Sequence, residues 1–461
     1  MQRALETIDV DYADARWQER KSLSIRITKG ELESANFTRL TGTGIRVWKD
    51  GGWGFSSTND PSSASLAEAA QNALRAAKIA ALNKKEKTKT LKERRPAQGR
   101  FQAIGTDPLA KHSYEEKMAV VRETEAAIRK GAKGIVSSTA VWREIDDHKL
   151  IVSTDGARVE LHYCKPDFYA VGVAKAGGQR VRAAEASGVT GGWKELFRKG
   201  SPEVLAERAA RRATALAKAK HLTGGRATVI LDPAVVGLIS HEAVGHTVEA
   251  DFVLAGSILK GKVGERVASD LVTLVDSGNP SEDAAAAGTI FADDEGTLSG
   301  RTVLIRKGIL VGYLHDRETA GILGQPVTGN ARAFEHTDEP IVRMTNTYIL
   351  PGDWTYEEIL HDTKEGYLVK GAGGGQADAN GEFMFEVQEA YRVENGELGE
   401  LYKSVTLSGQ TFDLLKSVDA ISREFAFDLG SGFCGKFQLA RVDGGGGYLR
   451  CQAILGGRQG A

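Results

Sequence analysis

Residues 227–251 read ATVILDPAVVGLISHEAVGHTVEAD, and this stretch determines how the C-terminal half of the chain is interpreted. The apolar run 227–231 predicts a short buried strand. The following Asp232-Pro233 predicts a helix start, because aspartate caps a helix and proline is tolerated in its first turn. The helix is expected to continue over residues 235–249. It is apolar on its buried side and also contains two histidines and two glutamates.

The polar centre of this helix is His241-Glu242-Ala243-Val244-Gly245-His246. A zinc peptidase needs three protein ligands, an open coordination position and a carboxylate that takes a proton from water. In HExxH helices the histidines are four residues apart and share a face. Here they are five apart, which turns the imidazoles roughly 140° from each other in a regular α-helix. A π-type turn would bring both onto one face, so we expect a bulge or break over residues 244–246, tolerated by Gly245.

The spacing alone leaves the third metal ligand open. HExxxH by itself is a weak pattern, but a buried helix would not carry these groups without partners. Glu249, Asp251 and a cysteine are all candidates. Cys434 lies in a glycine-flanked loop where Lys436 would favour the ionised sulfur, whereas Cys451 lies in an apparent strand and is typical of a structural cysteine. The third cysteine, Cys164, has no companion.

Composition and charge exclude several classes of protein. The chain has 461 residues, which favours two or three domains. Its 60 Lys and Arg nearly balance 61 Asp and Glu, which argues against nucleic-acid binding through a basic surface. No apolar stretch approaches the length of a membrane-spanning helix, the N-terminus lacks a secretory signal, and three scattered cysteines suit a reducing compartment. We therefore expect a cytoplasmic protein that binds neither nucleic acid nor membrane.

The element pattern predicts an α+β fold with extensive antiparallel sheet. Strand-like runs at 22–27, 44–48 and 52–55, with Asp50-Gly51 as a hairpin turn, precede an Ala-rich helix over 63–83. The charged stretch 84–99 predicts a solvated linker. We expect an N-terminal α/β region, made of domains at 1–95 and 96–223, and a larger β-rich domain at 224–461 that carries the metal-site helix.

The central domain has its own start signals. Ser113 and Glu116 form a predicted capping box, and Ser201-Pro202 begins a second helix that is expected to end near residue 220. Between them, residues 135–142 and 148–153 are expected to form two successive strands.

Several motifs along nearly the whole chain resemble the TldD/PmbA family of metallopeptidases, and specifically its TldD branch. The first is the run 241–246 followed by Glu249-Ala250-Asp251. The others are GIRV at 44–47, WGF at 53–55, DDEGT at 293–297, TGNAR at 328–332, RMTNTY at 343–348, GGGQ at 373–376 and CGK at 434–436. The chain departs from the family pattern after Cys434, where CGKFQ is one residue short, and at 446–448, where GGY replaces a closing Pro-Ser.

The resemblance implies a zinc ion held by His241, His246 and Cys434, with Glu242 as general base. It implies cleavage of small or unfolded peptides inside a closed cavity made by two subunits, either a homodimer or a heterodimer with a PmbA/TldE-like subunit. An extended peptide could be held by strand addition.

Three residues are candidates for substrate binding and for stabilising the developing oxyanion: Arg332, Asn346 and His315. A loop or sheet contact is an equal alternative for each. Two other functions stay open for the chain. One is a non-catalytic partner or modulator subunit, and the other is a cysteine hydrolase that uses Cys434 with a histidine.

Overall fold

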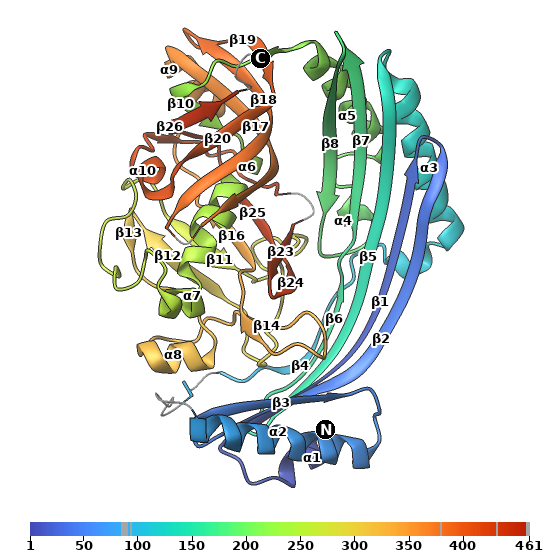
Figure 1. Cartoon of the computed structure of the whole chain (residues 1–461), viewed down its shortest axis with the longest axis vertical. Coiled ribbons are helices and arrows are strands. Elements are labelled where there is room, and N and C mark those ends of the chain that lie inside the picture. The colour runs from blue at the N-terminus through green and yellow to red at the C-terminus, as the bar shows by residue number, and fades with distance from the viewer. Residues whose placement is uncertain (84–90, 93–94, 379, 430–431, 458–461) are drawn as a thin grey trace.

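The computed structural model describes residues 1–83, 91–92, 95–378, 380–429 and 432–457, and it is a mixed α+β structure as predicted (Figure 1). Of the expected charged linker, residues 84–90 and 93–94 lie outside the described part. Among the described helices, none has the length and apolar character needed to cross a membrane.

A sheet that is antiparallel except for the parallel pair β4–β6, here called the N-terminal sheet, forms one side of the molecule (Figure 1). Within the described residues it has eight strands, in the order β3-β2-β1-β5-β6-β4 with β7 and β8 attached through β5. The strands are β1 (Tyr12–Thr28), β2 (Glu31–Lys49), β3 (Gly52–Thr58), β4 (Gln98–Ala103), β5 (Ile135–Ser153), β6 (Arg158–Cys164), β7 (Asp167–Ala176) and β8 (Gln179–Gly188). The sheet takes strands from both sides of residue 95, so the predicted boundary there does not coincide with a break in the sheet.

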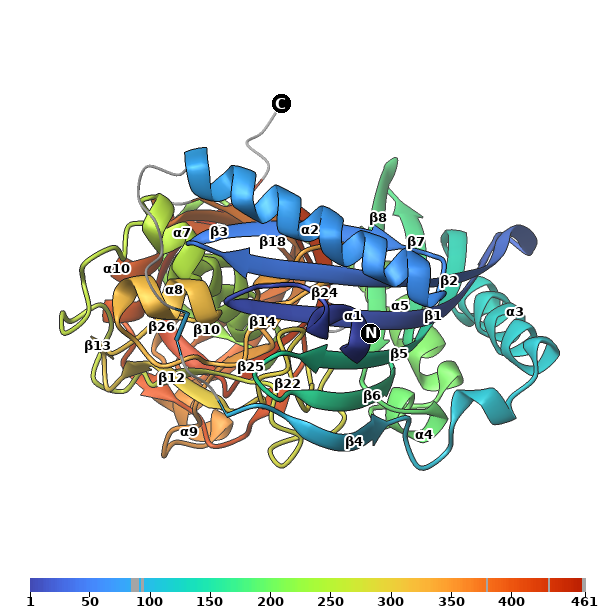
Figure 2. The same cartoon turned by 90° about the horizontal axis from the view of Figure 1, so that it is seen from below.

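Local signals predicted parts of this sheet and its helices well. Asp50 and Gly51 both have positive φ between paired Lys49 and Gly52, as a two-residue hairpin turn requires. Helix α2 (Ser63–Asn83) has the predicted bounds and lies along β3 (Figure 2). Residues 135–142 and 148–153 are strand as expected, but the expected break between them is wrong, because β5 runs through both without interruption.

Helices cover one face of the N-terminal sheet, and the rest of the chain contacts the other. Leu23 and Ile25 of β1 pack in a core with α3 (Tyr114–Gly131) and α5 (Pro202–Lys218). The capping box predicted at Ser113 begins α3. Side chains alternate along a strand, so Gln18 and Arg20 point to the opposite face, where both donate to the carbonyl of Phe334.

The C-terminal region, residues 220–457, is built on two further sheets and two short hairpins within its described part. One sheet runs β17-β10-β26-β20-β18-β19-β9 with β21 attached, and the other runs β13-β12-β11-β16-β25-β22. Their strands are β9 (Lys220–His221), β10 (Gly225–Leu231), β11 (Leu274–Ser277), β12 (Arg301–Arg306), β13 (Ile309–Leu310), β16 (Asn346–Ile349), β17 (Glu365–Ala377), β18 (Glu382–Glu394), β19 (Glu397–Lys403), β20 (Val405–Gln410), β21 (Ala420–Ile421), β22 (Ala426–Phe427), β25 (Asp443–Gly446) and β26 (Leu449–Gly456).

The hairpins and the remaining helices are short. The hairpins pair β14 (Ala331–Arg332) with β15 (Ile341–Val342), and β23 (Phe433–Lys436) with β24 (Gln438–Arg441). The helices are α1 (Gln2–Glu6), α4 (Trp193–Leu196), α6 (Pro233–Leu238), α7 (Ala250–Ala255), α8 (Arg317–Leu323), α9 (Tyr356–Asp362) and α10 (Thr411–Lys416), with a 3₁₀ turn at Leu109–Lys111. One large apolar core joins α6 to residues of both C-terminal sheets and to Cys434 of β23.

Candidate metal centre

An irregular helical segment carries both histidines of the motif. Asp232 caps α6 by accepting a hydrogen bond from the Val235 amide at 2.9 Å. The chain then widens into a π-helical segment, Ile239–Val244, and tightens into a 3₁₀ turn, Gly245–Val248. The predicted distortion is therefore confirmed, although it begins earlier than residue 244.

Gly245 has a different role from the one expected. Its φ of −54° and ψ of −48° are ordinary right-handed helical values, so its backbone makes no special demand for glycine. A Cβ at this position would lie 1.9 Å from Sδ of Met344 and 3.2 Å from the carbonyl oxygen of Ser240. Glycine is needed here because the neighbouring Met344 fills the space.

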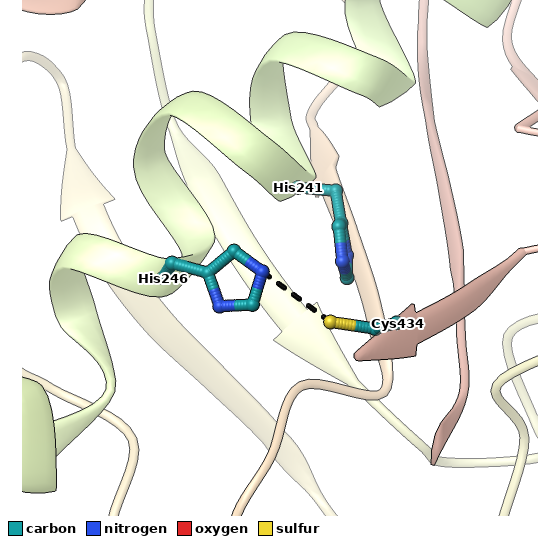
Figure 3. Close-up of side chains that lie close together, drawn as sticks. All are labelled: His241, His246 and Cys434. Carbon is teal, nitrogen blue, oxygen red and sulfur yellow. Dashed lines mark hydrogen bonds between the residues drawn. The ribbon is translucent and has the colours of Figure 1, made fainter. Parts of the chain in front are cut away.

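Three side chains from two separate segments converge beside this helix (Figure 3). His241 and His246 come from the helical segment and Cys434 comes from β23. One ligand atom of each lies within 4.8 Å of the other two, and Sγ of Cys434 is 3.3 Å from Nε2 of His246. Among the described residues this is the one group of three or more histidine, cysteine or acidic side chains arranged closely enough to hold a metal ion.

The surroundings of His241 fit a metal ligand. Its side chain is 1% exposed, and in the described structure neither ring nitrogen has a hydrogen-bond partner. Leaving a buried polar group unsatisfied costs roughly 1–3 kcal/mol. Two imidazole nitrogens and a thiolate form a three-ligand set that suits Zn²⁺ with an open fourth position. The residues present therefore fit the ion that the motif predicts.

Glu249 supports the cluster without joining it. Its Oε2 is 2.9 Å from Nδ1 of His246, which directs Nε2 of the same ring toward Cys434. Glu249 is fully buried and also contacts Nζ of Lys436 at 3.2 Å. Asp251 binds the same Lys436 at 2.7 Å. Thus neither acidic candidate for the third ligand lies in the cluster. Lys436 was expected to stabilise the ionised sulfur of Cys434, but it pairs with these two carboxylates.

Arg343 holds the hairpin that carries the cysteine, a role that the sequence did not indicate. Its Nη2 donates to the Cys434 carbonyl and its Nη1 to the Gln438 carbonyl, both at 2.8 Å. Because Arg343 is 1% exposed, water competes little for these bonds. The RMTNTY motif marked Arg343 in the sequence. Without the fold, the motif did not predict that this arginine contacts the hairpin of Cys434.

The cluster is electrostatically coupled. Burial would raise the pKa of Cys434, but the neighbouring His241 and His246 lower it to about 5. Burial would lower the pKa of His246, but hydrogen bonds to Cys434, Glu242 and Glu249 raise it to about 12. Burial would raise the pKa of Glu242, but the hydrogen bond to His246 lowers it, so the carboxylate is held in its ionised form. The sulfur is therefore poised as a thiolate, the form that binds metal.

Glu242 lies between the cluster and a cleft. Its Oε2 is 3.5 Å from Nε2 of His246, on the same nitrogen that faces Cys434. The cleft has a volume of about 430 Å³. Its lining residues are Glu242, His246, Thr247, Phe252, Ala255, Gly256, Ser257, Gly375, Gln376, Ala377, Asp378 and Gly435. A ligand in this cleft would meet the Glu242 carboxylate beside the metal position.

The three residues expected to bind substrate have other partners, and none is among the residues that line this cleft. Asn346 is buried, and its amide group bonds the Ser277 carbonyl and the Gly288 amide at 2.8 Å each. His315 is buried with Nδ1 3.1 Å from Oγ1 of Thr319, and burial lowers its pKa to about 4. Arg332 donates to the Met344 carbonyl and lines a different cavity. Their positions give no support to an oxyanion role.

Models of one protein family match the chain in three consecutive segments. Residues 13–77 match PmbA/TldA metallopeptidase domain 1, residues 107–217 match the central domain, and residues 224–454 match the C-terminal domain. All three proposed ligands and Glu242 lie in the third segment.

Curated proteins similar to this chain include a metalloprotease of Methanocaldococcus jannaschii, which is 38% identical over 96% of this chain and 97% of its own length. A metalloprotease TldD homologue of Haemophilus influenzae is 29% identical over 93% and 89%. A zinc metalloprotease TldD homologue of Saccharolobus solfataricus is 38% identical over 50% and 51%.

Two solved structures share the fold. A putative modulator of DNA gyrase from Thermotoga maritima aligns with a TM-score of 0.75 at 23% identity, over 96% of each chain. TldE from Thermococcus kodakarensis aligns with a TM-score of 0.74 at 19% identity, over 96% of this chain and 97% of its own.

Proposed function

The chain belongs to the PmbA/TldD family of metallopeptidases, and from this premise we propose that it is a zinc-dependent peptidase of the TldD type. The observation that carries the proposal is the convergence of His241, His246 and Cys434 within 4.8 Å, with the Glu242 carboxylate at the edge of an adjoining cleft. The zinc metalloprotease name of the Saccharolobus solfataricus relative supports the choice of metal.

In this proposal His241, His246 and Cys434 hold the ion, and Glu242 moves the proton. When bound, zinc supplies a Lewis acid that polarises the peptide carbonyl and makes water more acidic. Glu242 is ionised, because His246 lowers its pKa, so it can accept a proton from the attacking water and return it to the leaving amine. Glu249 keeps His246 in one orientation through Nδ1, and Arg343 keeps the Cys434 hairpin in register.

The cleft supports small or unfolded peptides as substrates. Residues 375–378 form one wall, and Gly375 and Gln376 belong to β17. An extended peptide beside this strand would be recognised mainly through its backbone, which predicts loose sequence preference. Phe252 of α7 also lines the cleft and offers an apolar surface for a side chain.

We also propose that two subunits enclose this site in the cytoplasm, as a homodimer or with a PmbA/TldE-like subunit. The motif resemblance supports this assembly. Light scattering of the purified chain, alone and mixed with a TldE-type subunit, tests it: a mass of one chain in both samples would contradict a two-subunit enclosure.

The decisive experiment is Glu242→Gln with metal analysis. The variant keeps the size of the side chain and the three ligands but loses the base, so it should bind one zinc ion and cleave unfolded peptides about 10²–10⁴-fold more slowly. Glu207→Gln, an exposed glutamate on α5, is the matched control and should retain parental activity. Equal cleavage by parent and Glu242→Gln would overturn the proposal, whereas a zinc-loaded parent that cleaves no peptide would favour a non-catalytic partner or modulator subunit.

A cysteine hydrolase is the second candidate, because Cys434, His246 and Glu249 form a chain of contacts at 3.3 and 2.9 Å. In that mechanism a chelator would leave activity intact and a thiol alkylator would abolish it. Zinc dependence predicts the loss of activity with chelator and its recovery when Zn²⁺ is added. His241, buried and without a hydrogen-bond partner among the described residues, has no task in the cysteine mechanism.

A further inference from the structure

A second, smaller cavity lies between the N-terminal sheet and the C-terminal region, and residues of β5, β6, β14 and β24 line it. Its volume is about 50 Å³. The charged residues that line it are five basic side chains and two acidic ones: Arg20, Lys149, Lys165, Arg332, Arg441, Asp147 and Asp294. All seven are buried. We call this space the cationic cavity.

The two carboxylates already have cationic partners. Asp147 pairs with Nη2 of Arg20 at 3.0 Å. Asp294 pairs with Nζ of Lys149 at 2.7 Å and also accepts a hydrogen bond from the Ala333 amide at 2.8 Å. Two of the five positive charges are therefore balanced within the wall. Arg441 contacts a carboxylate outside the cavity, Asp167 at 3.2 Å, which it shares with Arg143.

The remaining two cations have no carboxylate within 4.0 Å among the described residues. Nζ of Lys165 bonds three uncharged oxygens, those of Thr190, Ala287 and Thr289, at 2.9–3.0 Å. Arg332 donates from Nη1 to the Met344 carbonyl at 2.6 Å. Buried charges in proteins are normally paired, because removing an unpaired charge from water is costly.

Two of the lining residues also have hydrogen-bond donors without a partner in the described structure. Nη1 of Arg20 and Nε of Arg441 are buried and have no hydrogen-bond partner in the described structure. Arg20 is 6% exposed and Arg441 is 3% exposed, so bulk water does not satisfy them. Burial, followed by the neighbouring cations, lowers the pKa of Arg332 to about 10 and that of Lys165 well below its ordinary value. The wall thus carries more positive charge than its two carboxylates balance.

We propose that the cationic cavity binds one small oxyanion, such as a phosphate, a sulfate or a carboxylate group. Guanidinium groups match oxyanions because several N–H donors can meet several oxygens. A volume of about 50 Å³ holds a few water-sized groups and excludes a large side chain, since one water needs about 10–15 Å³ on the same scale. The anion would neutralise Arg332 and Lys165 and join the N-terminal sheet to the β23–β24 hairpin through Arg441.

The test uses the full chain, dialysed into chloride buffer, and titrates it with sodium phosphate at constant ionic strength. Calorimetry should show saturable binding of one phosphate per chain, and thermal unfolding should shift upward with the same concentration dependence. Arg332→Gln should bind phosphate about tenfold more weakly or worse, because it removes charge-assisted donors. Arg301→Gln removes one exposed positive charge outside the cavity and should bind as the parent does.

Parallel titrations identify the source of the oxyanion. Stronger binding of phosphate or sulfate than of acetate and an N-acetylated dipeptide supports an inorganic ligand, and the reverse supports the terminal carboxylate of a peptide. Lys165→Gln repeats the test on the other unpaired cation if Arg332→Gln fails to fold. The proposal is overturned if none of these anions gives saturable binding to the parent, or if both variants bind as tightly as the parent. These readouts do not depend on peptidase activity.

Discussion

The metal cluster and the cationic cavity both use residues of the β23–β24 hairpin, yet they are charged in opposite ways. Around the cluster, Cys434, Glu242 and Glu249 surround two imidazoles, and their negative charges raise the pKa of His246 to about 12. Around the cavity, cations outnumber carboxylates. The two charge distributions therefore favour ligands of opposite sign, in keeping with the proposed cation at the cluster and the proposed anion at the cavity.

The two sites also differ in backbone. The cluster is built on a π-helical segment, a 3₁₀ turn and a four-residue strand. The cavity takes Arg20 from β1, Lys149 from β5 and Lys165 from the position just after β6. Irregular backbone lets residues five apart converge on one point, whereas regular strands place side chains on a face at every second position.

The largest effect should come from removing a cluster ligand. Cys434→Ala leaves two imidazoles, too few protein ligands for a tight site, so zinc content should fall from one ion per chain to a trace and peptide cleavage to the uncatalysed background. Metal analysis of the purified variant checks this. Cys451→Ala, a buried cysteine of β26 outside the cluster, should keep its zinc. A zinc-loaded Cys434→Ala variant would contradict the assignment of the cysteine as a ligand.

The charge of the cluster can be measured when the metal is removed. In metal-free protein, the lowered pKa of Cys434 means that the thiolate persists down to about pH 5 and is protonated only below it. Ultraviolet thiolate absorbance should therefore decrease as the pH falls through this value. Burial raises the pKa of Cys164 and Cys451, so neither contributes near neutral pH. A midpoint near the free-cysteine value of about 8.5 would show that the imidazoles do not stabilise the sulfur.

The backbone difference explains how much could be predicted from the sequence. The helix cap at Asp232, the π-type distortion and the capping box at Ser113 follow from local chemistry, and the structure has all three. The two histidines were predictable because they lie within one segment. Cys434 was one of several possible third ligands until the family resemblance selected it, because its approach depends on a fold that spans the whole C-terminal region.

The rest depended on contacts between distant segments. Asp50-Gly51 predicted a hairpin, but the 17- and 19-residue lengths of β1 and β2 come from pairing with neighbours that a local window does not contain. The same limit hid the cationic cavity, since Arg20 and Arg332 are far apart in sequence. Arg332 was a candidate donor to the developing oxyanion, but the sequence around it carried no information about which cavity it lines.

A smaller effect should follow when the support of a ligand is removed. Glu249→Gln loses the charge that orients His246 through Nδ1, so zinc should bind about 10–100-fold more weakly. Competition with a chromophoric chelator measures this. Asp251→Asn is the matched control, because Asp251 shares Lys436 with Glu249 but does not contact His246. Equal losses in the two variants would assign the effect to Lys436 rather than to the orientation of the histidine.

The smallest expected effect tests why the irregular segment contains glycine. Gly245→Ala places a Cβ against Sδ of Met344, and overpacking of this kind costs about 1–3 kcal/mol in the free energy of unfolding. Chemical denaturation measures this cost. Gly300→Ala is the control, because a Cβ there meets no atom within 4 Å.

A double mutant separates space from conformation at Gly245. Met344→Ala alone leaves a void in the core, but combined with Gly245→Ala it removes the atom that the new Cβ would strike. The double variant should therefore lose less stability than the sum of the single losses. Additive losses would mean that the backbone of the π-to-3₁₀ transition itself requires glycine at position 245. Packing against Met344 would then not be the reason for this glycine.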